Sequence, residues 1–127
     1  MELWDFKNGE RNKILLWTLE LNSRDRAALN QKLDMLQRIE FDQARNLKLL
    51  NGLHRVGHIL KLRVMAQTAL RPLLCRGPQA PLREYTLLEG ASEKNSELHP
   101  AGAVETAIKN FDHVKNDETK RIRHERV

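Results

Sequence analysis

The sequence lacks several features that would assign it to a common class of protein. Its single cysteine, Cys75, excludes an internal disulfide framework and is typical of a protein of the reducing cytoplasm. No run approaches the ~18 apolar residues that a membrane span needs. The N-terminal stretch MELWDFKNGE carries acids and no apolar region, so no signal peptide is visible. These absences predict a cytoplasmic protein that does not bind a membrane.

Motifs of several enzyme classes are also missing. None of the six glycines comes close to the GxxxxGK[ST] or GxGxxG spacing of phosphate-binding loops. No nucleophile-elbow motif anchors Ser-His-Asp catalysis. His54 and His58 have the i, i+4 spacing that can hold a metal on a helix, but Gly52 and Gly57 flank them and no acid or cysteine joins them locally. We therefore interpret both as exposed loop histidines and expect neither a metal nor a cofactor.

Positive charge is concentrated in the centre of the chain. The formal net charge is +5, and five cations with no acid lie between positions 61 and 83: Lys61, Arg63, Arg71, Arg76 and Arg83. Positions 84 to 108 contain a single cation, Lys94, and five glutamates. A basic patch of this kind attracts polyanions, RNA first among them. The alternative is a solvated face that the neighbouring acids balance.

The N-terminal third of the chain predicts helices. Residues 3–6 are predicted to form a short extended segment that ends at a turn. The apolar density of residues 10–21 suits a short buried helix, with a strand over residues 14–19 as the alternative. Asn22 is a good N-cap with Asp25 in the capping-box position, and it precedes a helix from Ser23 to about residue 39.

The centre of the chain predicts strands. Residues 47–53 are interpreted as a turn region, and residues 59–65 as a half-buried strand whose cations face outward. Two short apolar runs, residues 70–75 and 85–88, are bounded by proline and glycine and predict the buried strands of a hairpin. Pro72 cannot donate a ladder hydrogen bond, so we expect a bulge or an edge there.

The C-terminal part predicts one more helix. Pro100 is expected to open this helix, which continues to about residue 115. Residues 116–127 form a charged tail that either extends the helix or is mobile. Helices first, strands next and a helix last is an α+β layout, and the length fits a single domain over residues 1–127.

The cationic hairpin and the polar turn after it suggest a chemistry. RNA is cut without metal when its 2′-OH attacks the adjacent phosphate, provided that the protein moves two protons and neutralises charge on phosphorus. We expect Arg71, Arg76 and Lys94 to gather in one exposed pocket. The candidate catalytic residues are Arg71, Arg76, Lys94, Tyr85 and His124, and the candidate RNA-binding residues are Lys61, Arg63, Arg83 and Arg123. Ordinary surface charge is the alternative, and Cys75 is interpreted as buried packing.

Three stretches resemble a known family in their order and spacing. LRPLLCRGP, EYTLLEGASEKN and the helix AGAVETAIKNF resemble the HigB-like branch of the RelE/ParE toxin superfamily, including its phage-derived members. Arg71 takes the place of an arginine early in a strand, Leu88-Glu89-Gly90 that of a Leu-x-Gly strand end, and Glu93-Lys94-Asn95 that of a polar segment. The preceding KLLNGLHRVGHILKLRV resembles the family as well. The chain departs from the pattern at Ala91, where an aromatic residue is usual.

The resemblance implies two N-terminal helices packed on a small, mainly antiparallel sheet with a C-terminal helix. Active members of the branch are ribosome-dependent mRNA endonucleases, and an antitoxin, often one with a helix-turn-helix, neutralises them. Tyr85 and His124 are not carried over from the family. Two alternatives share the fold: a non-catalytic phage or prophage accessory binding protein, and a ParE-like toxin that acts on a gyrase.

Overall fold

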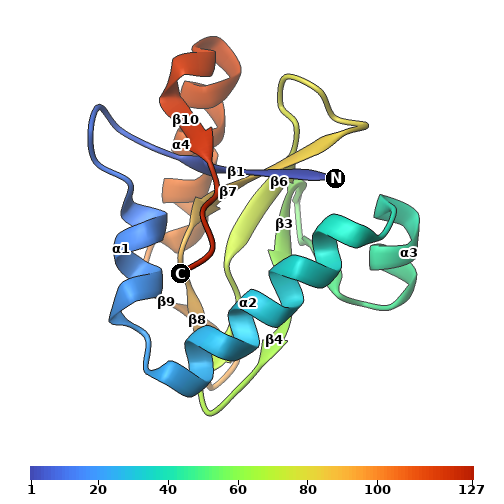
Figure 1. The fold of residues 1–127 in the computed structure, drawn as a ribbon, viewed down its shortest axis with the longest axis vertical. Coiled ribbons are helices and arrows are strands. Elements are labelled where there is room, and N and C mark those ends of the chain that lie inside the picture. Colours follow the sequence, from blue (N-terminus) through green and yellow to red (C-terminus); the bar gives the residue numbers. More distant parts are fainter.

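The computed structural model describes residues 1–127 and has a mixed α+β architecture (Figure 1). Its helices are α1 (Lys13–Glu20), α2 (Ser23–Arg38), α3 (Phe41–Asn46), α4 (Ala103–Asn116) and the short 3₁₀ helix η1 (Glu118–Lys120). The larger sheet has the order β10 (Arg121–Arg123), β1 (Glu2–Phe6), β7 (Glu84–Glu89), β6 (Leu73–Arg76), β3 (Val56–Leu62) and β2 (Leu50–Leu53). The smaller sheet has the order β4 (Val64–Met65), β5 (Ala69–Leu70), β8 (Ser92–Lys94) and β9 (Glu97–His99). None of the helices has the length and apolarity that crossing a membrane requires.

The predicted hairpin forms the centre of the larger sheet. Strands β6 and β7 pair antiparallel, with Arg76 opposite Tyr85. Strand β1 lies parallel to β7, and every other pair in the sheet is antiparallel. The prediction of a hairpin is therefore confirmed, and the sheet is mainly antiparallel.

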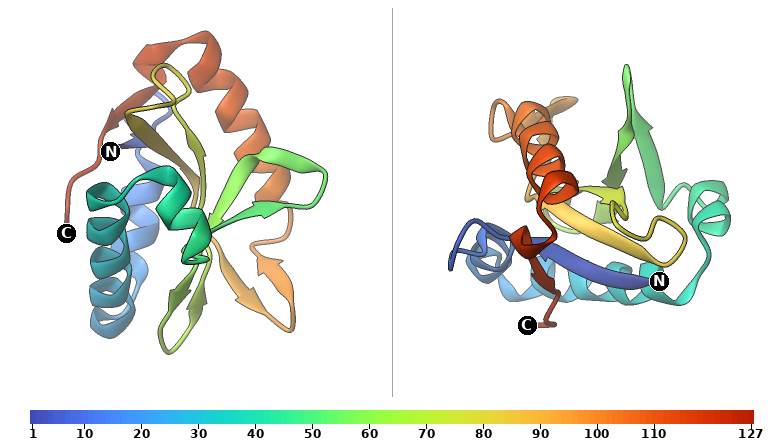
Figure 2. Two further views of the ribbon diagram at one scale, coloured as in Figure 1. Left: turned by 90° about the vertical axis from the view of Figure 1, so that its right-hand side faces the viewer. Right: turned by 90° about the horizontal axis from the view of Figure 1, so that it is seen from above.

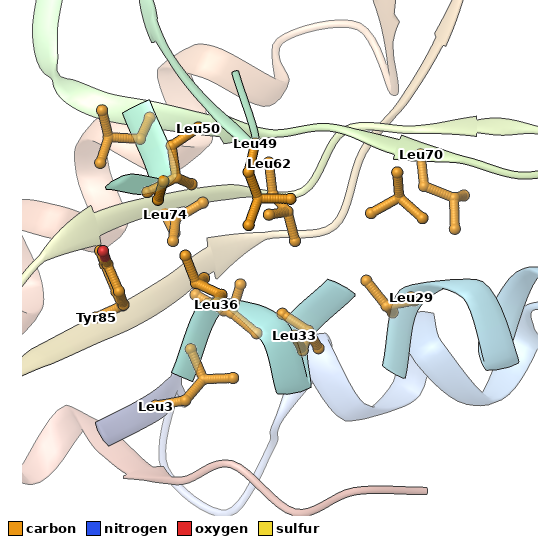
Figure 3. Close-up of a cluster of buried hydrophobic side chains, with 14 of the residues drawn as sticks. Leu3, Leu29, Leu33, Leu36, Leu49, Leu50, Leu62, Leu70, Leu74 and Tyr85 are labelled. Carbon is orange, nitrogen blue, oxygen red and sulfur yellow. The ribbon is translucent and has the colours of Figure 1, made fainter. Parts of the chain in front are cut away.

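Helices cover both faces of this sheet (Figure 2). Helices α1 and α2 pack apolar side chains on one face, where Leu36 of α2 lies beside Leu74 and Tyr85 of the hairpin and Leu29 lies opposite Leu70 (Figure 3). Helix α4 packs on the other face through its small residues. Because both faces are covered, β6 and β7 are buried over almost their whole length, which explains why they read as continuous apolar runs.

The two sheets meet along a line at which three chain segments change sheet. Strand β3 passes into β4 at Arg63, β5 into β6 at Arg71 and Pro72, and β7 into β8 after Gly90. Backbone hydrogen bonds cross this junction, from Arg71 N–H to Ala91 O at 2.8 Å and from Leu62 N–H to Pro72 O at 3.0 Å. The predicted strands over residues 59–65 and 70–75 are thus each divided in two, and Pro72 lies at the interruption.

Capping side chains fix the starts of the N-terminal helices. The Asn22 side chain accepts a hydrogen bond from the Asp25 N–H at 2.8 Å, as predicted for an N-cap. Asn12 caps α1 in the same way through the Leu15 N–H at 3.0 Å. Residues 14–19 are therefore helical, and the alternative of a strand is wrong.

Three predictions of local structure need correction. Residues 47–53 are not only a turn, because Leu50–Leu53 form β2 on the edge of the larger sheet, and the preceding α3 was not predicted. The last helix begins at Ala103 rather than at Pro100, and Gly102, with a φ of 80°, is its N-cap. The tail neither extends α4 nor hangs free, because Arg121–Arg123 pair with β1 as strand β10.

Candidate functional site

A cationic pocket of about 370 Å³ lies where β3 and β6 cease to pair. The pairing of these strands is confined to Leu60 with Leu74 and Lys61 with Leu73, so His58 and Arg76 face an opening in the sheet. Helices α3 and α4, from opposite faces of the sheet, complete the pocket. Its lining residues are Phe41, Arg45, Gly57, His58, Leu60, Arg76, Pro78, Pro81, Phe111 and Lys115.

Two aromatic rings hold the basic groups of this pocket. The Arg76 guanidinium lies 4.0 Å from the centroid of the Phe41 ring. The His58 imidazole lies 4.6 Å from the Phe111 ring, centroid to centroid, and Lys115 Nζ lies 5.9 Å from the same ring. Cations are attracted to the faces of aromatic rings, so these contacts position the charges without neutralising them.

The charge of the pocket is uncompensated. No acid lines it, and Arg45, Arg76 and Lys115 form no ion pair with a carboxylate of the chain. Arg76 donates only its Nε–H within the chain, to Pro81 O at 3.3 Å, which leaves the rest of its guanidinium for a ligand. Such an arrangement can neutralise an anion such as a phosphate while aromatic rings contact an attached base.

Of the five candidate catalytic residues, only Arg76 lines this pocket. Tyr85 lies opposite Arg76 in the hairpin, but its ring is fully buried and its hydroxyl has no hydrogen-bond partner. Burial raises the pKa of Tyr85 to about 12, although the charge of Arg76 acts in the other direction. Tyr85 is thus part of the core beside the pocket.

The expectation that Arg71, Arg76 and Lys94 gather in one exposed pocket is wrong. Arg71 is 9% exposed, and its guanidinium donates to Glu93 Oε2 at 3.1 Å, to Leu70 O at 2.8 Å and to Val64 O at 3.1 Å. Lys94 lines a different cleft on the smaller sheet. The reason is the junction at Pro72, which places Arg71 between the two sheets and separates it from Arg76 at the far end of β6.

His124 is also engaged elsewhere. Its Nδ1 lies 2.9 Å from Asp5 Oδ1, and the two side chains are 7% and 2% exposed. The other carboxylate oxygen of Asp5 accepts a hydrogen bond from the Asn12 side chain at 3.0 Å. This buried network fastens the C-terminal tail to β1 and to the start of α1, so His124 has a structural position.

The four candidate RNA-binding residues do not form one surface. Lys61 lies 3.7 Å from Glu93, and Arg63 lines a groove beside α2. Arg83 and Arg123 lie near Met1 and the neighbouring acid Glu2, with which Arg123 forms an ion pair at 2.6 Å. The basic charge of the centre is therefore spread over several sides of the molecule.

The sequence analysis did not predict the other aromatic and cationic residues of the pocket, although their spacing indicates that they share helix faces. Phe41 and Arg45 in α3, and Phe111 and Lys115 in α4, are both aromatic–cation pairs at i, i+4, which places each pair on one face of its helix. His58 is exposed as predicted, but it belongs to strand β3 rather than to a loop. No group of three or more His, Cys, Asp or Glu side chains is arranged to hold a metal ion.

Cys75 has the buried position that its apolar run indicates. The residue is 0% exposed in the core beneath α4. Burial raises the pKa of its thiol to about 12, so the thiolate that a nucleophile needs does not form near neutral pH. Cys75 takes no part in the candidate site.

Comparisons with known proteins give no independent assignment. No model of a protein family matches the chain, and neither a curated protein nor a solved structure matches it.

Proposed function

We propose that the chain is a toxin of the HigB/RelE type, whose cationic pocket binds single-stranded RNA and cuts it without a metal ion. The observation that carries the proposal is the meeting of three unpaired cations, two phenyl rings and one imidazole in a single pocket. Unpaired cations attract the phosphates of RNA, and aromatic rings stack on its bases. This combination is better suited to a single strand than to a protein or a small apolar ligand.

The arrangement of the elements supports the proposal. Two N-terminal helices, a mainly antiparallel sheet and a C-terminal helix are what the resemblance to the toxin branch implies. Helices α1 and α2 precede strands β2, β3, β6 and β7 of the larger sheet and α4 follows them, while strand β1 precedes the helices and β10 comes after α4. The Leu-x-Gly strand end also has a physical role, because Gly90 lies directly against the Trp17 ring of α1. The HigB/RelE-like fold itself is part of the proposal.

The residues of the pocket supply the groups that cleavage needs. The 2′-oxygen of one ribose forms a bond to the adjacent phosphorus while the bond from phosphorus to the 5′-oxygen of the next nucleotide breaks. The neutral imidazole of His58 accepts the 2′-OH proton, and Arg45 and Arg76 offset the added charge on the phosphoryl oxygens. The Lys115 ammonium donates a proton to the leaving 5′-oxygen. The products are a 2′,3′-cyclic phosphate and a 5′-hydroxyl.

The proposal includes two partners. The substrate is mRNA on the ribosome. An antitoxin with a helix-turn-helix, encoded next to this chain, neutralises the toxin. Expression of the chain alone should arrest growth, and co-expression of the neighbouring gene should restore it. Arg76→Gln is the appropriate inactive variant for this assay, because Arg71→Ala would act through the stability of the fold.

A second candidate is RNA binding without catalysis. It is favoured by one observation: the pocket holds a single imidazole, while the Tyr85 ring is buried in the core beside the pocket and the His124 side chain pairs with Asp5. On this view the chain is an accessory binding protein that uses the same cationic pocket.

The binding part of the proposal is tested with a fluorescein-labelled 12-nucleotide single-stranded RNA in EDTA. Arg76→Gln and Lys115→Gln should each weaken binding roughly three- to tenfold. Each should also reduce the magnitude of the slope of log K against log salt concentration by about 0.7, as expected for one lost phosphate contact. Lys109→Gln is the matched control, because Lys109 is an exposed cation of α4 that does not line the pocket. Equal losses for Lys109→Gln and Lys115→Gln would refute an RNA site in the pocket.

Cleavage is tested separately, with free RNA and with translating ribosomes. His58→Asn should retain RNA binding and lose the cyclic-phosphate product, since an amide cannot accept the 2′-OH proton as imidazole does. Specific binding with no product from the wild-type chain under either condition would select the non-catalytic alternative.

A further inference from the structure

A second groove, independent of the cationic pocket, lies beside α2 and has a volume of about 510 Å³. Helix α2, the segment before β2 and the passage from β3 into β4 form its walls. The residues that give it its character are Lys32, Met35, Leu47, Lys48, Arg63 and Met65. It shares no residue with the cationic pocket.

Large apolar side chains are unusually exposed in this groove. Leu47 and Met65 are each 60% exposed, and of the large apolar residues only Leu82 is more so. Met65 is also held in place, because its sulfur lies 3.5 Å from the guanidinium Nη2 of Arg71. Exposed apolar side chains that gather in one hollow are typical of protein–protein contact sites, and methionine is common there.

The groove is also positively charged without compensation. Lys32, Lys48 and Arg63 form no ion pair with any carboxylate of the chain, and no acid lines the groove. The complementary partner therefore carries carboxylates around apolar side chains. RNA fits less well, because the groove offers aliphatic and thioether groups and no aromatic ring on which bases stack.

We propose that this groove binds an acidic amphipathic helix of a partner protein, with apolar side chains of the helix contacting Leu47 and Met65 and its carboxylates meeting Lys48 and Arg63. An amphipathic helix laid in a hydrophobic groove is a common mode of peptide recognition. The proposal does not depend on RNA binding or cleavage at the cationic pocket.

The chain offers a direct assay because it has three methionines, Met1, Met35 and Met65. Two of them line the groove, and Met1 lies in a separate hollow, so it is an internal control. The probe is a synthetic 18-residue helix with leucines on one face and glutamates on the other, added to protein labelled with ¹³C at the methionine methyls. We expect the methyl signals of Met35 and Met65 to shift and that of Met1 to stay unchanged.

Three comparisons make the assay specific. A peptide of the same composition in scrambled order, and one with lysine in place of glutamate, should leave the signals unchanged. Lys48→Glu with Arg63→Glu should weaken binding of the acidic helix at least tenfold. Lys94→Glu with Lys109→Glu changes the net charge equally outside the groove and should weaken it less than threefold.

Several results would overturn the proposal. Unchanged signals of Met35 and Met65 at millimolar acidic peptide would exclude binding of the helix in this groove. Equal losses of affinity in the two double variants would exclude it as well. Shifts of Met35 and Met65 with a 12-nucleotide RNA and none with the acidic helix would make the groove a nucleic-acid surface. Shifts that depend on protein concentration alone would make it a contact between copies of the chain.

Discussion

Arg71 and Glu93 form a hydrogen-bonded ion pair at the junction of the two sheets, with Nε 3.1 Å from Oε2. The Arg71 side chain is 10% exposed and that of Glu93 is 26% exposed. The same guanidinium also satisfies the carbonyls of Val64 and Leu70. Arg71 thus connects β4, β5 and β8, although its place in the sequence suggested a group that binds substrate.

The Arg71→Ala variant should lower the free energy of unfolding by about 3 kcal/mol, because it leaves one carboxylate and two carbonyls without their donor. Urea unfolding followed by circular dichroism measures this loss. Lys61→Ala is the matched control, since Lys61 contacts the same Glu93 at 3.7 Å from a more exposed position and should cost less than about 1 kcal/mol. Equal effects of the two variants would contradict a structural role for Arg71.

Gly90→Ala should also be destabilising, for a steric reason. A Cβ at position 90 would lie 2.2 Å from Trp17 Cδ2, so the Trp17 ring or the backbone on one side of the contact must move. Overpacking of a buried position costs about 1–3 kcal/mol. Gly57→Ala is the control, because a Cβ there meets nothing within 4 Å and should change stability by less than about 1 kcal/mol in either direction. Thermal unfolding of the two variants compares them, and a Tm for Gly90→Ala equal to that of the wild type would refute the clash.

Local patterns predicted the elements whose signals are local. The N-cap at Asn22, the apolar stripe of α2 and the continuous apolar runs of β6 and β7 all depend on neighbours in the sequence, and the structure has them. Helix α3 was missed because six residues, Phe41–Asn46, are too few to display a helical period, and its Glu40 N-cap makes no side-chain hydrogen bond. The strand break at Pro72 was foreseen as an irregularity, but not as a passage between two sheets.

The candidate site was less predictable because its residues come from distant segments. Arg45, Arg76 and Lys115 belong to α3, β6 and α4, and only the fold brings them together. Conversely, Arg71 and Lys94 lie close in the sequence, but this closeness does not show which way their side chains point. In the structure the Arg71 side chain pairs with Glu93 instead. The charge count located positive charge correctly in the chain, but pairing with Glu93, Glu84 and Glu2 decides which cations remain unpaired.

Removal of the His124 side chain should loosen the C-terminal tail. His124→Ala leaves the buried Asp5 carboxylate with Asn12 as its one side-chain partner, which should cost about 1–3 kcal/mol. Arg123→Ala is the control, because the ion pair of Arg123 with Glu2 is solvent-exposed and should contribute less than about 1 kcal/mol. Amide hydrogen exchange of β1 should rise in the first variant only. Unchanged exchange in His124→Ala would show that the tail stays in place without this network.

Glu89, at the end of β7, should make stability depend on pH. Burial raises the pKa of its carboxyl, although the Gly90 N–H and the charge of Lys13 both act in the opposite direction. A folded-state pKa above the unfolded value means that the folded protein binds the proton more tightly. The resulting stabilisation is complete below the ordinary glutamate pKa and is lost as the pH rises through the folded value. At neutral pH the ionised Glu89 is therefore unfavourable in the folded protein.

Glu89→Gln should accordingly raise the urea midpoint at pH 7 and leave it nearly unchanged at pH 4, where the wild-type carboxyl binds its proton in the folded state. Glu125→Gln is the matched control, because Glu125 is exposed in the tail and forms no ion pair, so it should shift neither midpoint. A gain for Glu89→Gln of the same size at both pH values would assign the effect to packing at the end of β7. A loss at pH 7 would show that the attraction of Lys13 outweighs the burial of Glu89.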